Sequence, residues 1–453
     1  MATSPTLAPP RRARLLADLL QLAWPMLIGQ VAQMGAGVAD TVMAGAAGPT
    51  DLAAVALGFS IWLPFFLFAV GLLNAVTARI ARAYGARDAA AQADTFQQGL
   101  WVTLALTALG LAVIPQSHRL LPLLAIAPGV QPPTQLYLHG ITLGIPAILG
   151  FQWLAALVEG RGHARRVMTV KIISLLANIP LNYIFIHGLY GAPRLGGAGC
   201  GWATGCVMWL ELLLLAALSR KHWQVLLAHP DLTGKRSPQW RELRALLDLG
   251  VPIGSALFAE SSIFSGAALL VGRLGATTLA AHQIALNYTA LVFMVPLSLG
   301  LALTVKISHA LGAGERLRAR RFAGVGAACA AVFALCSAAV MLAFPYTIAS
   351  AYSGDELVRL LTVQILAYAA SFQLFDGLQV TAAGSLRGYH DTRSTMLITL
   401  FAYWVIGLPL GYALGFTAAF GSALGVFGIW MGLVAGLAVA ALLLNWRLAA
   451  ISR

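Results

Sequence analysis

The chain is built from long apolar stretches that are separated by short polar breaks. Its composition, 59% hydrophobic and only 10% charged, is far more apolar than that of a soluble domain. Apolar runs long enough to cross about 30 Å of hydrocarbon as a helix recur along the whole chain. The predicted spans are 15–44, 52–78, 96–116, 136–158, 168–187, 198–218, 244–271, 279–305, 322–345, 358–384, 396–415 and 421–446. We therefore predict an all-α polytopic membrane protein with about twelve transmembrane helices.

Basic residues are distributed unequally between the two ends of these spans. All but four of the 29 Lys and Arg residues fall on one side, and the exceptions are Arg119, Arg194, Arg273 and Arg359. The positive-inside rule makes the basic side cytoplasmic, and an even number of spans then places both termini there. The net charge of +13 thus has a topological cause and does not require nucleic acid as a partner.

The two halves of the chain repeat each other. At a shift of 227 residues LAAVAL (52–57) meets LAAHQI (279–284), and at 228 GRGHARRVM (160–168) meets GYHDTRSTM (388–396). We predict two six-helix bundles related by a pseudo-two-fold axis along the membrane normal, with the substrate route between them. The predicted parts are a cytoplasmic tail at 1–14, a first bundle at 15–218, a cytoplasmic linker at 219–243, a second bundle at 244–446 and a tail at 447–453.

Four acidic residues lie inside apolar stretches, namely Asp40, Glu211, Glu260 and Asp376. Each costs roughly 2.5–3.5 kcal/mol at the bilayer centre on insertion scales, and such residues usually face a cavity or an ion path. The repeat does not reproduce Asp40, Glu260 or Asp376, so the fold itself does not require them. The pattern therefore indicates transport of a cation or of a cationic solute.

Other chemistry is not visible in the sequence. The four cysteines have no metal-ligand or disulfide spacing, and no nucleotide-binding GxxxxGK[ST] loop or His/Asp, Ser/His or metal constellation occurs. We expect neither an enzyme nor an ATP-driven pump, and no cofactor apart from a coupling ion.

Several collinear motifs resemble the multidrug and toxic compound extrusion (MATE) transporters, specifically their NorM-like bacterial branch. They are WPMLIGQVAQMGAGVADTVMAG, DLAAVALGFSIWLPFFLFAVGL and FDGLQVTAAGSLRGYHDTR, and the resemblance runs from about residue 15 to 445. It implies two six-helix bundles around a V-shaped central cavity in the bacterial inner membrane. It also implies antiport of small cationic drugs against Na+ or H+, with Na+ favoured, by a protein that we expect to be a monomer.

The resemblance assigns ion coupling in the second half to Glu260 and Asp376, which are also the expected Na+ ligands. Two carboxylates in a site of low dielectric repel each other, and a proton or a hard cation relieves that repulsion. A cationic drug would compete with the ion for the same negative charge. The alternatives are that a neighbouring helix satisfies Glu260 and that Arg387 or Arg393 satisfies Asp376.

In the first half, the expected cation or proton site joins Asp40 to Asn178, Asn182 and Thr204. Asn178 and Asn182 share one helix face, and Pro180 between them should bend the helix and free a carbonyl. The better-known site of this kind in the family that the chain resembles has an acid where Asn182 stands, so Asp40 alone would carry charge here. Interhelical hydrogen bonding is the alternative role of the two asparagines.

For the drug itself, the resemblance points to a set of residues from both halves. They are Gln33, Asp40, Ser60, Phe264, Gln283 and Asp355. Asp355 has an alternative as an ordinary solvated loop acid. Glu211 matches no family role, and we expect it to reach the cytoplasmic face or to pair with Arg220 or Lys221.

A lipid or lipid-linked oligosaccharide flippase of the same superfamily is the competing function. Such a protein would be expected to offer a more basic cavity for phosphate headgroups. The ionisable residues noted above are acidic instead.

Overall fold

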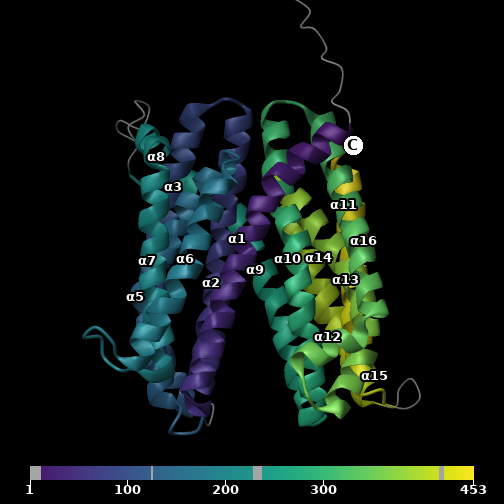
Figure 1. Cartoon of the computed structure of the whole chain (residues 1–453). Helices are drawn as coiled ribbons and strands as arrows, with labels where there is room; N and C mark the ends of the chain where they lie inside the picture. The colour runs from purple at the N-terminus through teal and green to yellow at the C-terminus, as the bar shows by residue number, and fades with distance from the viewer. Residues whose placement is uncertain (1–11, 124–125, 228–236, 418–422) are drawn as a thin grey trace, which may run out of the picture. The chain divides into compact units, whose positions relative to one another are not determined.

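The computed structural model describes residues 12–123, 126–227, 237–417 and 423–453, which form helices and connecting loops without a strand (Figure 1). Twelve helices are long and apolar enough to cross a membrane, and each corresponds to one predicted span. The prediction of an all-α polytopic protein is therefore confirmed. The elements are α1 (Arg12–Ala47), α2 (Pro49–Gly85), α3 (Ala89–Val113), η1 (Ile114–Arg119), α4 (Leu120–Leu123), α5 (Gln131–Gly160), α6 (Ala164–His187), η2 (Gly196–Ala198), α7 (Gly199–Leu218), α8 (Arg220–Leu227), α9 (Trp240–Gly272), α10 (Ala276–Gly312), α11 (Arg316–Ala343), α12 (Pro345–Tyr352), α13 (Glu356–Gly388), α14 (Thr392–Leu400), the π-helical η4 (Phe401–Gly407), α15 (Leu408–Phe416) and α16 (Val426–Ile451).

The backbone repeats where the sequence does. Left-handed or otherwise positive φ angles occur at corresponding loop positions of the two halves, mostly at glycine, which adopts them without steric cost. The pairs are Gly48 and Gly275, Arg87 and Gly314, and Gly162 and His390. The same helix–loop geometry is therefore built twice along the chain.

The chain forms two compact units, and the division falls inside two helices. The unit called here the N-unit is Pro25–Phe258, and the C-unit is the chain up to Trp24 together with Ala259–Arg453. The sequence instead placed the boundary in the linker at 219–243, of which 228–236 lies outside the described residues. The bundle limits drawn from the sequence, and the symmetry axis between the bundles, stay predictions.

The first half of α9 belongs to the N-unit because it packs closely on α2. A Cβ added to Gly71 would lie 2.5 Å from the Cα of Gly254, so the two backbones touch. Arg79 also donates to the Glu242 carboxylate at 2.6 Å. In the C-unit, the first half of α1 reaches α11 through Asp18, whose carboxylate lies 3.5 Å from the guanidinium of Arg318.

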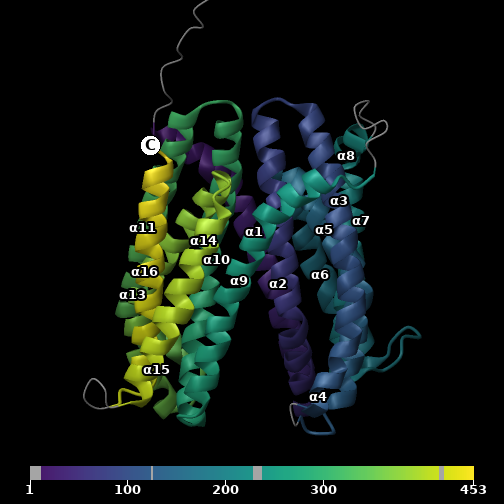
Figure 2. The same cartoon turned by 180° about the vertical axis from the view of Figure 1, so that it is seen from behind.

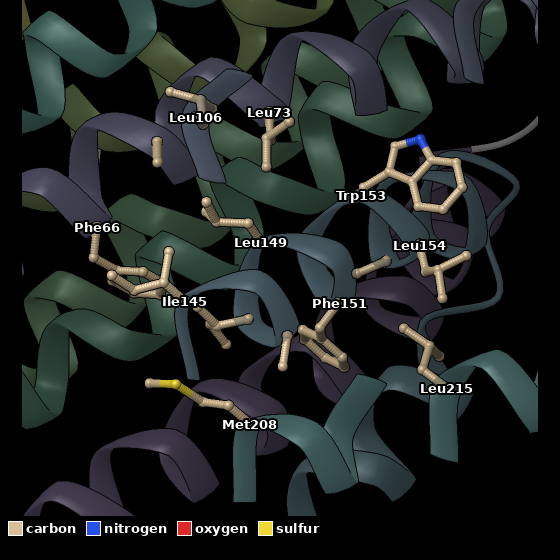
Figure 3. Packing of buried hydrophobic residues seen from close by; sticks show 14 of the residues in the cluster. Phe66, Leu73, Leu106, Ile145, Leu149, Phe151, Trp153, Leu154, Met208 and Leu215 are labelled. Carbon is tan, nitrogen blue, oxygen red and sulfur yellow. The ribbon is translucent and has the colours of Figure 1, made fainter. Parts of the chain in front are cut away.

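The apolar core of the N-unit is centred on α5 (Figure 3). Trp153 on this helix stacks on Phe96 of α3 with ring centroids 4.1 Å apart, and its indole N–H donates to the Phe96 carbonyl at 2.8 Å. Leu149 and Ile145 are buried one and two turns earlier on the same helix. α5 thus presents apolar side chains to α2, α3 and α7.

In the C-unit, which Figure 2 shows from the other side, α13 packs against α10, α11 and α16. Small residues let these helices approach closely, as is typical of helix pairs in membranes. A Cβ on Gly384 would lie 2.3 Å from the Gly300 carbonyl oxygen, and one on Gly432 would lie 2.3 Å from the Gly411 Cα. These contacts leave no room for larger residues between α10 and α13 or between α15 and α16.

A histidine pair connects the loop after α5 to α8. The rings of His163 and His222 lie edge to face with centroids 5.4 Å apart, and Arg166 donates to Nδ1 of His222 at 2.9 Å. Burial lowers the pKa of both histidines, and the charges of Arg166 and Arg161 lower it further. Both imidazoles are therefore neutral at pH 7, and α8 is attached through a group that can become charged.

Acidification should loosen α8. Because the pKa of each histidine is lower in the folded protein than its ordinary value of about 6.5, the stabilisation is complete above that value and is lost as the pH falls below it. Hydrogen exchange of residues 220–227, corrected for the intrinsic pH dependence of exchange, should accelerate between about pH 7.5 and about pH 5.5. The double variant His163→Gln/His222→Gln should lose this response. Equal protection of 220–227 in the wild type at both pH values would contradict the prediction.

Candidate functional site

The four polar residues predicted for the first half lie together in the N-unit. Asn182 of α6 donates to Oδ1 of Asp40 on α1 at 2.6 Å, and Thr204 of α7 donates to Oδ2 at 3.0 Å. The same Asn182 amide donates to Oδ1 of Asn178 at 3.0 Å. Asp40, Asn178 and Asn182 are all buried. Three helices therefore meet at one carboxylate.

The bonds that Asn182 and Thr204 donate to Asp40 join different helices, so Asn182 also has the alternative role of interhelical hydrogen bonding, whereas the bond between Asn182 and Asn178 lies within α6. Two neutral donors satisfy the Asp40 carboxylate, one on each oxygen. Oδ1 of Asn182, however, is buried and has no hydrogen-bond partner among the described residues. An acceptor left free beside a carboxylate suits a proton or a small cation.

The predicted acid pair lies in the C-unit. Glu260 is on the second half of α9 and is partly buried, whereas Asp376 on α13 is 2% exposed. The two carboxylates interact electrostatically with each other. One oxygen of Asp376 has no hydrogen-bond partner within the described chain. The site therefore combines like charges with incomplete hydrogen bonding, which is costly in an apolar bundle.

Arg387 faces this site, although its place in the sequence indicated a cytoplasmic anchor. It lies in the last turn of α13, is 6% exposed and interacts electrostatically with Glu260. Of the two acids, Glu260 and not Asp376 therefore has Arg387 as an electrostatic neighbour. The Nε atom of Arg387 still has no acceptor in the part of the chain that the structure describes.

Three further buried side chains that carry oxygen were not predicted from the sequence: two are close to Asp376 along α13, and the third interacts with Asp376 electrostatically. Gln373 and Gln379 flank it at three-residue intervals on α13, and Tyr403 lies on η4. All three are buried, and Oε1 of each glutamine and the hydroxyl of Tyr403 have no hydrogen-bond partner among described residues. The spacing in FQLFDGLQ was the available signal for the two glutamines.

An aromatic layer lies one helical turn away from the acids. Phe264 follows Glu260 by four residues and Phe372 precedes Asp376 by four, so each ring shares a helix face with its acid. The two phenylalanine rings meet edge to face at 5.9 Å, and Phe372 meets Trp430 at 5.8 Å. A flat cation could place its charge toward the acids and its ring against this layer.

The residues predicted for drug binding are divided between the two units. Gln33, Asp40 and Ser60 belong to the N-unit, where Gln33 and Ser60 are exposed, and Phe264, Gln283 and Asp355 belong to the C-unit. Asp355 is the N-cap of α13, because its carboxylate accepts from the amides of Leu357 and Val358. This capping role agrees with the alternative of an ordinary loop acid.

Glu211 has a partner that the sequence did not indicate. Its two carboxylate oxygens lie 3.0 and 2.9 Å from Nζ of Lys171, and both side chains are buried. The expected pairing of Glu211 with Arg220 or Lys221 is therefore wrong. Lys171 is inside α6, whereas the sequence had placed it at the cytoplasmic end of that span. Lys171 also lies over the ring of Phe151 at 4.5 Å.

Among described residues, no group of three or more His, Cys, Asp and Glu side chains could hold a metal ion. The expected Na+ site has two acids, and its other donors would be neutral oxygens. Its assignment to an ion stays a prediction.

The MatE family model matches residues 25–184 and 252–413, one match in each half, and the two matches begin at the offset of the internal repeat. The chain is 47% identical over 439 residues to the multidrug resistance protein PmpM of Pseudomonas aeruginosa, covering 97% of this chain and 92% of that protein. It is 41% identical over 436 residues to the multidrug resistance protein NorM of Vibrio cholerae, covering 95% and 94%. The chain therefore belongs to the MatE family, whose members are membrane transporters and not enzymes.

Solved structures agree on the fold. The outward-facing structure of a multidrug resistance MATE family transporter superposes with a TM-score of 0.85 at 22% identity, covering 99% of this chain and 100% of that one. A MATE structure in the bent conformation also gives 0.85, at 21% identity. Together with the twelve apolar helices, these similarities establish a multi-pass membrane protein.

The Lys171–Glu211 pair can be tested by a double-mutant cycle. Lys171→Met or Glu211→Leu alone should destabilise the protein by about 3–5 kcal/mol, because each leaves one buried group without its partner. The double variant Lys171→Met/Glu211→Leu should recover most of the loss of thermal stability in detergent. Glu315→Gln, which breaks an exposed pair with Arg318, is the control and should cost less than about 1 kcal/mol. Additive effects of the two single changes would contradict the pairing.

Proposed function

We propose that this chain is a multidrug efflux transporter that exports cationic drugs in exchange for Na+ or H+, with Na+ favoured. The observation that carries the proposal is the acid pair Glu260 and Asp376, in which Asp376 keeps an oxygen without a hydrogen-bond partner among the described residues and which lies beside an aromatic layer. Membership of the MatE family and the multidrug resistance names of the relatives support the same activity.

In this proposal, drug and ion compete for one negative site. An organic cation bound near Glu260 and Asp376 loses its counter-charge when a monovalent cation neutralises the carboxylates. Release of the drug and entry of the ion are then linked by mass action, and the ion gradient supplies the free energy. The chemistry requires binding, exclusion of water and exchange of charge, with no covalent step.

The polar cluster at Asp40 is proposed to serve the N-unit in the same way. Its carboxylate is already hydrogen-bonded by Asn182 and Thr204, so neutralising it would release those donors and loosen the junction of α1, α6 and α7. Asp40 is the one acid of this cluster, and a proton or one cation would be enough to neutralise it.

The buried basic groups favour a transporter of cationic drugs over a lipid flippase. Lys171 is held by Glu211, and Arg387 faces Glu260, so both cations already have acidic neighbours. A site for a phosphate headgroup would need cations that are free to bind an anion. The proposed location is the bacterial inner membrane with both termini cytoplasmic, and the proposed state is a monomer.

Removing either acid of the C-unit should uncouple drug efflux from the ion. Glu260→Gln and Asp376→Asn should each lower ion-driven efflux of ethidium from loaded vesicles by at least about tenfold, which corresponds to about 1.4 kcal/mol. Asp376→Asn should fold, because a neutral amide is less costly to bury than a carboxylate. Glu260→Gln also removes the acidic neighbour of Arg387, so its thermal stability in detergent is measured beside its efflux. Glu315→Gln, on an exposed loop, is the control and should transport normally. Normal efflux in both acid variants would remove the pair from the mechanism.

The coupling ion can be identified by imposing the gradients separately. In proteoliposomes, an inward Na+ gradient without a pH gradient should drive drug export, and collapse of that gradient should stop it. The reciprocal experiment imposes a pH gradient without Na+. Drug export driven by ATP with both gradients abolished would contradict secondary active transport altogether.

A further inference from the structure

The eleventh span is not a continuous α-helix. Between α14 and α15 the chain forms the π-helical segment η4, Phe401–Gly407, which is the sole π-helix among the described residues. A π-turn places an extra residue in the helix, shifts the side chains that follow and occurs frequently at functional sites. Here it is packed against α16, where a Cβ added to Gly436 would lie 3.0 Å from the Cα of Gly407.

The π-turn lies directly beside the acid pair. The indole of Trp404 donates to the carbonyl of Ala259 at 3.4 Å, and Ala259 immediately precedes Glu260 on α9. The preceding residue on the π-turn, Tyr403, is 2% exposed and interacts electrostatically with both Glu260 and Asp376. The π-turn is therefore joined to α9 at the residue next to Glu260, and its buried Tyr403 is an electrostatic neighbour of both acids.

The hydroxyl of Tyr403 has no hydrogen-bond partner among the described residues. A buried tyrosine usually finds such a partner, and leaving a buried hydroxyl unsatisfied costs about 1–3 kcal/mol. The unpaired oxygens of Gln373, Asp376 and Gln379 belong to the same helix bundle. Several oxygen atoms without donors are what a hard monovalent cation requires.

We propose that Tyr403 is a third ion-binding residue of the C-unit, whose phenolic oxygen is a neutral ligand for Na+ bound between Glu260 and Asp376. This inference rests on the proposed exchange of drug for an ion at the acid pair. It adds a ligand that carries no charge and therefore acts on the ion more than on an organic cation. In this proposal, the π-turn directs the hydroxyl of Tyr403 toward the two acids.

The variant Tyr403→Phe removes only the hydroxyl and conserves the ring that packs in the C-unit core. In proteoliposomes with saturating drug, the Na+ concentration for half-maximal efflux should rise about tenfold, equivalent to about 1.4 kcal/mol of lost ion affinity. Maximal efflux at high Na+ and drug affinity measured without Na+ should stay unchanged. Tyr412→Phe, on α15 of the same span and 44% exposed, is the matched control.

A second measurement does not depend on transport. Na+ should raise the melting temperature of the wild type and of Tyr412→Phe in detergent, because a ligand that binds only the folded state stabilises it. This shift should be reduced in Tyr403→Phe at the same Na+ concentration. If the Phe variant is not recovered folded, Tyr403→His, which also lacks the phenolic oxygen, should give the same loss.

The outcomes separate this inference from the proposed function. A wild type whose drug efflux and stability do not respond to Na+ refutes Na+ coupling itself. A wild type that responds to Na+, with Tyr403→Phe responding equally, overturns the ligand role of Tyr403 while leaving the antiport intact. A changed pH dependence with an unchanged Na+ dependence in Tyr403→Phe also overturns it.

Discussion

A carboxylate inside a hydrocarbon layer must be neutralised by its surroundings, and this requirement organises the polar interior of the chain. Three buried acids meet it in three ways. Glu211 is paired with Lys171, and Asp40 accepts hydrogen bonds from the neutral side chains of two other helices. Asp376 keeps an oxygen without a partner and faces a second acid. The degree of neutralisation therefore ranks the acids. Asp376 is the least satisfied, and together with Glu260, whose basic neighbour is Arg387, it is the most suitable for exchanging cations.

The internal repeat reproduces the backbone more faithfully than the chemistry. Positive φ angles recur at the same loop positions in both halves, but the charged residues next to these loops differ. The position of Glu159 in the first half holds Arg387 in the second, and that of His163 holds Asp391. Asp391 forms an ion pair with Arg447 at 2.6 Å, whereas His163 contacts another histidine. One helical scaffold thus carries a different electrostatic site in each half.

The helices, the repeat, the acids in apolar stretches and the grouping of residues around Asp40 were all predicted from the sequence. Lys171 and Arg387 were predicted at the cytoplasmic ends of spans, because a charge at the edge of an apolar stretch is typical of an anchor. Both are buried in the structure and face acids on other helices. Tyr403 could not be found, because nothing in FAYWVIG marks the start of a π-turn.

The amino-acid sequence by itself determined the membrane spans, the duplication and the presence of acids in apolar stretches. Hydropathy and spacing are properties of a single helix and its solvent, so a local pattern is enough to show them. Only the tertiary structure decided which acids are paired and which keep an oxygen without a hydrogen-bond partner. The partner of Glu211 is 40 residues away and that of Asp40 is 142 away, each on another helix. Neutralisation of a buried charge depends on such distant atoms within about 3 Å, and packing alone brings them there.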